Sequence, residues 1–165
     1  MVLIDLYNTQ DVWNRAMGPG FRWTVILSPD EVRGLEWIQQ STPKEARVQV
    51  EPTVRDRDTW AYVPAFAERR MSGGAPIGMI PLAKYEKVSG EIAQAYASPS
   101  AVEAYDRLLN LCVDYLVVGP PERSAYPALQ PRLDATPQLF PPVFSNGALA
   151  IYAVSGSWNR EGCPH

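Results

Sequence analysis

The stretch from Asp114 to Val118 constrains the fold more than any other part of the chain. It reads Asp-Tyr-Leu-Val-Val, so an extended strand here is apolar on both faces. This pattern is typical of a strand in a sheet that helices cover on both sides. Helical spacing upstream predicts a helix, restarted after Ser98-Pro99, that buries Val102, Tyr105, Leu108, Leu109 and Cys112. We therefore expect helices packed against a central sheet.

Two short motifs locate further elements. Ser28, Pro29 and Glu31 match a capping box with proline at the first helical position, which predicts a helix that stops before Thr42-Pro43. Asn146-Gly147, between two apolar runs, is the typical sequence of a β-hairpin turn. Less regular patterns predict strands near residues 21–27, 47–51 and 77–80, a helix over 64–71 that ends at Gly73-Gly74, and a short helix between 122 and 133.

Alternating strands and helices predict an α/β fold. We expect a layered domain with a partly parallel sheet flanked by helices and a C-terminal β-hairpin. Residues 1–154 are expected to form this single α/β domain, and residues 155–165 are expected to be a flexible tail.

Charge and hydropathy exclude two classes of protein. The net charge of −3, with a pI of about 5.2, argues against a nucleic-acid partner, because phosphate binding needs a clustered basic excess. No segment approaches the roughly 20 apolar residues that a membrane helix needs. The N-terminus lacks the basic region of a signal peptide. Taken alone, the chain is expected to be soluble.

Few residues suited to catalysis or metal binding are present. The single histidine is His165, which excludes zinc sites with several histidines and argues against a histidine-based triad. Gly73-Gly74 lacks the spacing and the lysine of a phosphate loop. The two cysteines do not make a disulfide framework: we expect Cys112 to be a small buried hydrophobic residue and Cys163 to be a free thiol. We therefore predict no catalytic residue, no metal site and no cofactor.

One charged and aromatic segment suggests ligand binding. Trp60, Tyr62, Arg69 and Arg70 follow the charged run 55–58, and arginines beside aromatic rings can hold a phosphate or stack on a sugar. The alternative is a solvated segment whose charges pair locally. Asp114 and Glu122-Arg123, at the two ends of the predicted strand, have the character of a loop ion pair or a helix cap, although ligands usually bind at the carboxyl ends of such strands.

Several stretches together resemble a known kind of domain. They are Asp5–Asn8, Asn14–Trp23, Glu36–Ile38, Phe66–Met71, Asp114–Val118 and Val143–Gly147. The chain resembles, up to about Val154, the extracytoplasmic C-terminal soluble domain of bacterial multi-spanning membrane proteins similar to family C glycosyltransferases. In such enzymes the catalytic carboxylates lie in the membrane-embedded part, so the resemblance implies no catalytic residue in this chain.

The resemblance also implies a setting. It places the domain on the extracytoplasmic face of a bacterial membrane, periplasmic or extracellular. Its partners are then the membrane-embedded part of the same protein and a glycan or a lipid-linked sugar phosphate. Two functions remain open: a non-catalytic accessory domain that aids glycan or acceptor binding, or a stand-alone small-ligand-binding or hydrolytic α/β protein that uses the region from Arg55 to Arg70.

Overall fold

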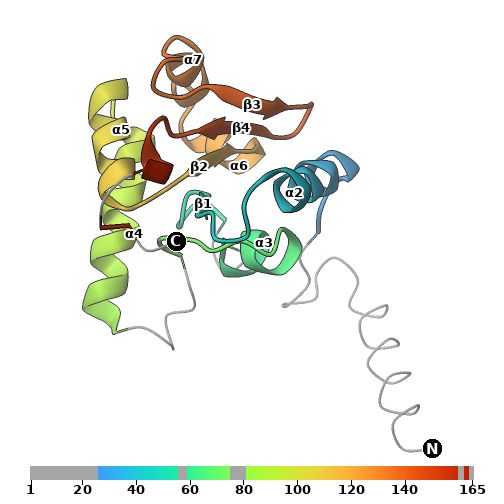
Figure 1. Cartoon of the computed structure of the whole chain (residues 1–165), viewed down its shortest axis with the longest axis horizontal. Helices are drawn as coiled ribbons and strands as arrows, with labels where there is room; N and C mark the ends of the chain where they lie inside the picture. The colour runs from blue at the N-terminus through green and yellow to red at the C-terminus, as the bar shows by residue number, and fades with distance from the viewer. Residues whose placement is uncertain (1–25, 56–58, 75–80, 160–161, 164–165) are drawn as a thin grey trace, which may run out of the picture.

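The structure, a computed structural model, describes residues 26–55, 59–74, 81–159 and 162–163. In chain order its elements are α2 (Pro29–Ser41), β1 (Val48–Gln49), α3 (Thr59–Phe66), α4 (Leu82–Ala97), α5 (Ala101–Asn110), β2 (Tyr115–Val118), α6 (Pro120–Ala125), α7 (Leu129–Asp134), β3 (Pro142–Ser145), β4 (Ala150–Ala153) and the 3-10 helix η4 (Ser157–Asn159). Helices α4 and α5 lie on one side of the sheet, and α2 and α3 lie on the other (Figure 1). The predicted layered α/β fold is confirmed.

The sheet is mixed, with strand order β1-β2-β4-β3. β1 pairs with β2 in parallel, with Val48 opposite Tyr115. β4 pairs with β2 and with β3 in antiparallel fashion, so the C-terminal strands complete the sheet on the side away from β1. The sheet is therefore partly parallel, as predicted, and the parallel pair includes the strand at one edge.

Successive residues of β2 enter two separate hydrophobic cores, because side chains alternate between the faces of a strand. Leu116 and Val118 belong to the core beneath α4, α5 and α7. Val117 belongs to the core beneath α2 and α3. All three side chains are at most 1% exposed. The strand is thus apolar on both faces for the reason that the sequence indicated: helices cover both faces of the sheet.

The capping box of α2 is present. The Ser28 hydroxyl accepts a hydrogen bond from the Glu31 backbone amide at 3.2 Å, and the Glu31 carboxylate accepts one from the Ser28 amide at 2.9 Å. Two of the amides that a helix leaves unbonded at its N-terminus are thereby satisfied. The helix ends at Ser41, before Thr42-Pro43, as predicted.

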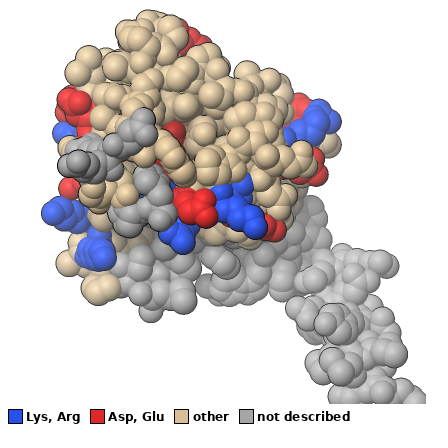
Figure 2. All heavy atoms as spheres, in the orientation of Figure 1, with Lys and Arg blue, Asp and Glu red and all other residues tan. Residues whose placement is uncertain are grey.

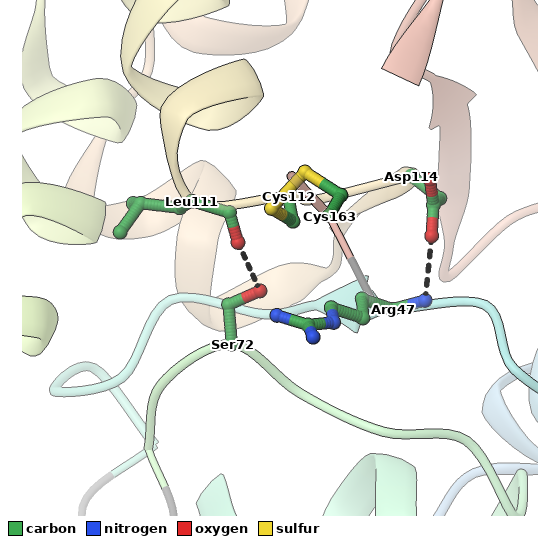
Figure 3. The surroundings of a disulfide bond; sticks show 6 residues. All are labelled: Arg47, Ser72, Leu111, Cys112, Asp114 and Cys163. Carbon is green, nitrogen blue, oxygen red and sulfur yellow. Dashed lines mark hydrogen bonds between the residues drawn. A yellow bond between two sulfur atoms is a disulfide. The ribbon is translucent and has the colours of Figure 1, made fainter. Parts of the chain in front are cut away.

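The expectation of two unpaired cysteines was wrong. Cys112 and Cys163 form a disulfide whose Cα atoms lie 5.6 Å apart, and the two cysteines are 51 positions apart in sequence (Figure 3). Cys112 has a left-handed backbone, with φ of 56°, at the C-terminus of α5. Its amide bonds to the carbonyl of Leu109, and the next amide, of Val113, bonds to Leu108. These two bonds form a Schellman motif, in which glycine usually takes this position.

The helix predicted over 64–71 lies earlier in the chain, as α3. Pro64 lies inside α3 rather than in a first turn. The helix tolerates it because it ends two residues later, so the missing amide interrupts only its last turn. Glu68, with φ of 52°, follows the helix end, whereas Gly73-Gly74 lies farther along the chain and does not end it.

Three further expectations were only partly correct. The segment 122–133 holds two short helices, α6 and α7, rather than one. Val102, expected to be buried on α5, is 59% exposed. The predicted hairpin is confirmed, but its connection spans 146–149. The Asn146 side chain accepts hydrogen bonds from the amides of Ala148 and Leu149, and this closes the longer loop.

Some predictions fall outside the described residues. The predicted strand at 77–80 and most of the predicted strand at 21–27 lie there, so the structure does not test them.

No helix in the described part of the chain has the length and apolar character that a bilayer crossing requires. On the face shown in Figure 2, positive and negative side chains of the described residues are interspersed rather than separated into patches of one sign.

Candidate functional site

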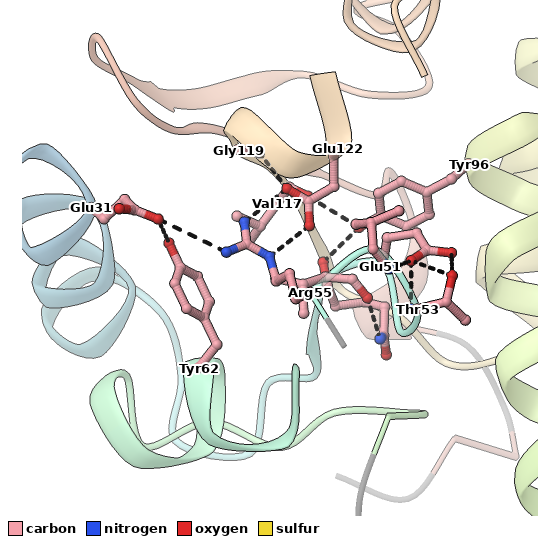
Figure 4. A network of polar contacts seen from close by, with 12 residues as sticks. Glu31, Glu51, Thr53, Arg55, Tyr62, Tyr96, Val117, Gly119 and Glu122 are labelled. Atoms are coloured by element: carbon pink, nitrogen blue, oxygen red, sulfur yellow. Dashed lines mark hydrogen bonds and ion pairs between the residues drawn. The ribbon is translucent and has the colours of Figure 1, made fainter. Parts of the chain in front are cut away.

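The carboxyl ends of β1 and β2 lie side by side, because these strands are parallel neighbours. Open α/β sheets usually place ligands at this edge. Charged residues gather there: Glu51 follows β1 closely, and Glu122 lies in α6, which follows β2 after one residue. Arg55 reaches the same place from the loop after β1 (Figure 4). We take this network as the first candidate site.

Its centre is a buried ion pair between Arg55 and Glu122. The arginine Nε donates to Oε1 at 2.7 Å and Nη2 donates to Oε2 at 2.7 Å, which is a bidentate geometry. The Glu122 side chain is 0% exposed and that of Arg55 is 5% exposed. Burial lowers the pKa of Arg55, but the hydrogen bonds and negative charge of Glu122 outweigh it, so the pKa is raised. The guanidinium of Arg55 therefore stays protonated at ordinary pH.

The start of α6 requires glycine at position 119. The Gly119 amide donates to Glu122 Oε2 at 2.8 Å, so the carboxylate caps the helix as well as binding Arg55. A Cβ at position 119 would lie 2.5 Å from Arg55 Nη2, so any other residue here would displace the guanidinium from its place beside Glu122. The sequence Gly-Pro-Pro-Glu thus allows the guanidinium to approach the helix start. Glu122 acts as both a helix cap and a loop ion pair, the two structural roles that the sequence indicated.

Tyr62 extends the network to α2. The guanidinium carbon of Arg55 lies 4.0 Å from the centre of the Tyr62 ring, close enough for a cation–π contact. The Tyr62 hydroxyl donates to Glu31 Oε1 at 2.9 Å, and Arg55 Nη1 lies 3.8 Å from the same oxygen. Burial raises the pKa of Tyr62, although the Arg55 charge lowers it, so the hydroxyl stays a neutral donor. Helices α2, α3 and α6 are therefore joined through one arginine.

Glu51 forms the other half of the network. Its carboxylate accepts hydrogen bonds from the backbone amides of Thr53 and Val54 and from the Thr53 hydroxyl. Tyr126 donates its hydroxyl to Glu51 Oε1 at 3.2 Å. Burial, followed by the charge of Glu51, raises the pKa of Tyr126 to about 12. The loop after β1 is thus held to the end of α6.

This edge of the sheet is therefore occupied by the chain itself. Both carboxylates accept several hydrogen bonds, and the guanidinium makes a bidentate pair. Such a network fixes the loop after β1 against three helices. It leaves little capacity to bind a ligand without breaking existing bonds.

The residues predicted to bind a ligand do not form one group. Tyr62 belongs to the Arg55 network, whereas Arg69 lies between the ends of α2 and α3 and is 5% exposed. Arg69 donates to the Thr42 hydroxyl and to four backbone carbonyls, of Gln39, Thr42, Ala67 and Glu68. Arg70 is exposed, and its backbone bridges to Arg47. The side chain of Trp60 lies outside the described set. Ligand binding by these four residues stays a prediction.

Metal ligands are not grouped in the described part of the chain. Among those residues, no set of three or more His, Cys, Asp or Glu side chains is arranged to hold a metal ion.

No family model matches the sequence, and no curated protein matches it. The fold has a solved counterpart: the C-terminal globular domain of an oligosaccharyltransferase from Archaeoglobus fulgidus. The TM-score is 0.57 at 11% sequence identity, over 79% of this chain and 100% of the archaeal one. The two chains share a fold.

This likeness bears out the coarser part of the resemblance seen in the sequence, since the matching structure is an oligosaccharyltransferase C-terminal domain. The matching protein is archaeal, however, whereas the sequence suggested bacterial relatives.

Proposed function

We propose that this chain is a non-catalytic soluble accessory domain of a membrane glycosyltransferase-like protein, where it aids the binding of a glycan or acceptor. The observation that carries the proposal is the shared fold, which extends over the whole of an oligosaccharyltransferase C-terminal domain. The stretches that resemble family C glycosyltransferases in sequence support the same assignment.

The disulfide supports an extracytoplasmic location. Structural disulfides form and persist in oxidising compartments and are rare in the cytosol of most organisms. The Cys112–Cys163 bond therefore favours a location outside the cytoplasm, and the resemblance in sequence is what suggests the periplasmic or extracellular face of a bacterial membrane. There the domain would lie beside the membrane-embedded part of the same protein, which would bind a lipid-linked sugar phosphate.

The closed network at the carboxyl edge suits such a role. Arg55 and Arg69, which a stand-alone binding or hydrolytic protein would need in solution, are both buried and bonded to their own chain. They act as cross-links between loops and helices. A rigid domain of this kind can position an acceptor next to a membrane active site without contributing to the chemistry.

The test is a transfer assay in membranes that contain the complete native protein. Deleting the present 165 residues should reduce glycosyl transfer per molecule of membrane protein. Abundance is measured in parallel, so that loss of folding is separated from loss of activity. Unchanged transfer after the deletion, or turnover of a sugar phosphate by the isolated chain that a point mutation abolishes, would contradict the proposal.

A further inference from the structure

The pair Asn146-Gly147, which forms the turn between β3 and β4, is also chemically reactive. In an Asn-Gly pair the backbone nitrogen of the glycine can attack the carboxamide carbon of the asparagine, because no side chain shields that nitrogen. Asn146 is the one asparagine of this chain that glycine follows. The sequence therefore makes Asn146 the residue most prone to spontaneous deamidation, and the structure shows how its side chain is held.

The Asn146 carboxamide makes three hydrogen bonds. Its Oδ1 accepts from the amides of Ala148 at 2.9 Å and Leu149 at 2.8 Å. Its Nδ2 donates at 2.8 Å to the carbonyl of Asp30, in the first turn of α2. In deamidation the carboxamide carbon turns towards the Gly147 nitrogen and Nδ2 is lost, so the three bonds cannot all persist. The folded hairpin is therefore expected to hold the reaction back.

A second helix holds the backbone of the same turn. Arg123, in α6, donates from Nη1 to the Ala148 carbonyl at 2.8 Å and to the Gly147 carbonyl at 3.4 Å. Gln130 fixes the guanidinium by accepting from Arg123 Nε at 2.7 Å. Glycine at 147 also leaves room for the Asp30 carboxylate, because a Cβ at this position would lie 2.9 Å from its Oδ2. Helices α2 and α6 thus both hold the turn.

We propose that Asn146 is a site of spontaneous deamidation that reacts only when the turn opens away from α2 and α6. In the open turn the Gly147 nitrogen attacks the Asn146 carboxamide carbon and gives up its proton. A new C–N bond closes a succinimide ring, the bond from the carbon to Nδ2 breaks, and ammonia leaves with that proton. Water then opens the ring and leaves aspartate or isoaspartate at position 146.

One atom links this reaction to hydrogen exchange. Asn146 Oδ1 is the acceptor for the amides of both Ala148 and Leu149, whose side chains are 7% and 0% exposed. An opening that frees the carboxamide therefore also exposes these two amides to solvent. When opening and closing are fast, both processes slow by one factor, which the population of the open turn sets. The slowing of deamidation is therefore predicted in size as well as in direction.

The experiment incubates the full 165-residue chain, folded or unfolded in urea, at one pH and temperature. Peptide mapping by mass spectrometry gives the rate of deamidation at Asn146, and hydrogen exchange gives the protection factors of the Ala148 and Leu149 amides. We expect deamidation to be at least about tenfold slower in the folded chain, because three hydrogen bonds oppose it. This retardation should match the protection factors within about threefold.

Arg123→Ala tests the hold of α6 on the turn. The variant loses the bonds to two carbonyls of the turn, so deamidation and exchange should both become faster, by a shared factor of about three or more. Arg107→Ala is the matched control, since Arg107 is also partly exposed and paired, with Glu103, but lies on α5. It should change neither rate. If Arg123→Ala does not fold, urea below the unfolding transition should raise both rates of the unmodified chain in proportion.

Several results would overturn the proposal. Equal deamidation rates in the folded and unfolded chains would show that the turn gives no protection. Absence of deamidation at Asn146 in the unfolded chain would show that the site is not reactive. Faster exchange, in Arg123→Ala or in urea, with unaltered deamidation would show that the two processes do not share one opening. The inference rests on the hairpin alone, so none of these results bears on the accessory function.

Discussion

Two buried carboxylates, at opposite ends of β2, are bonded very differently. Glu122, at the carboxyl end, is 0% exposed and accepts hydrogen bonds from Arg55 Nε, Arg55 Nη2 and the Gly119 amide. Asp114, at the amino end, is 3% exposed and accepts one hydrogen bond, from a backbone amide. Both lose nearly all contact with water, but only Glu122 has an opposite charge in its place.

The difference lies in how far each carboxylate's loss of water is offset within the chain. Desolvation of a carboxylate is offset when an opposite charge and further donors surround it. Glu122 meets this condition within the chain, so it holds the fold together. Asp114 does not, because its Oδ1 is buried without a hydrogen-bond donor. The edge where α/β sheets usually bind ligands is thus closed by bonds within the chain, whereas the opposite edge contains a carboxylate whose burial is offset less completely.

The largest expected effect comes from Glu122→Gln. Neutralising this carboxylate removes the bidentate partner of the buried Arg55 guanidinium and leaves only the more distant Glu31 as an opposite charge. The loss of a buried charge partner typically costs about 3–5 kcal/mol of folding free energy. Urea denaturation should show this decrease. The double variant Arg55→Met/Glu122→Leu should recover most of it, because it removes the buried guanidinium together with its carboxylate partner. A loss below about 1 kcal/mol for Glu122→Gln would mean that the network is not a main support of the fold.

Leu116→Ala tests how much the core packing of β2, the strand between the two carboxylates, contributes to the free energy of unfolding. Leu116 is 1% exposed, so truncation should cost about 2–5 kcal/mol in the same denaturation assay. Leu109→Ala is the matched control, because Leu109 only partly enters the same core and should lose less. An equal loss at both positions would show that burial along this core is more even than the structure describes.

Removing the disulfide with Cys112→Ser/Cys163→Ser should cost about 2–4 kcal/mol, because the unfolded chain regains the freedom of a long loop. Thermal denaturation gives the magnitude. Hydrogen exchange should show lost protection around residues 155–158 while the Arg55 network stays protected. Cys112→Gly serves as a control, since it keeps the left-handed position of the Schellman motif without the cross-link. An equal loss of protection around residues 155–158 and in the Arg55 network would show that the disulfide stabilises both edges of the sheet alike.

The smallest change is expected for Asp114→Asn, the counterpart of Glu122→Gln. The amide oxygen can still accept from the Arg47 amide, and no opposite charge is left behind. Stability should change by no more than about 1 kcal/mol, with either sign. The variant should also lower the pKa of Tyr115, which is raised by burial and then by the Asp114 charge. A large destabilisation would show that Asp114 is as structural as Glu122.

Local signals in the sequence predicted much of the fold. The capping box of α2, the doubly apolar strand β2 and the Asn146-Gly147 hairpin each depend on neighbouring residues and were confirmed. The position of α3 was wrong, because Pro64 was assumed to need a first turn, whereas the end of a short helix also accepts it. Glu122 has the structural role that its place after the end of the predicted strand indicated.

Long-range partners could not be read from the sequence. Arg55 and Glu122 are 67 residues apart, and Cys112 and Cys163 are separated by 51, so nothing in their neighbours indicates the pairing. The burial of Arg69 depends on where two helices end in space.

The disulfide also determines how the chain would respond to a pulling force. The cross-link encloses β2, α6, α7, β3 and β4 in one covalent loop. Tension applied between the two termini would pass from Cys112 directly to Cys163 and bypass that loop. The fully stretched oxidised chain should therefore be shorter than the reduced one by roughly 160–180 Å, at ~3.3–3.6 Å per residue for the enclosed residues. The strands from β2 onward are thus protected from mechanical extension until the bond is reduced.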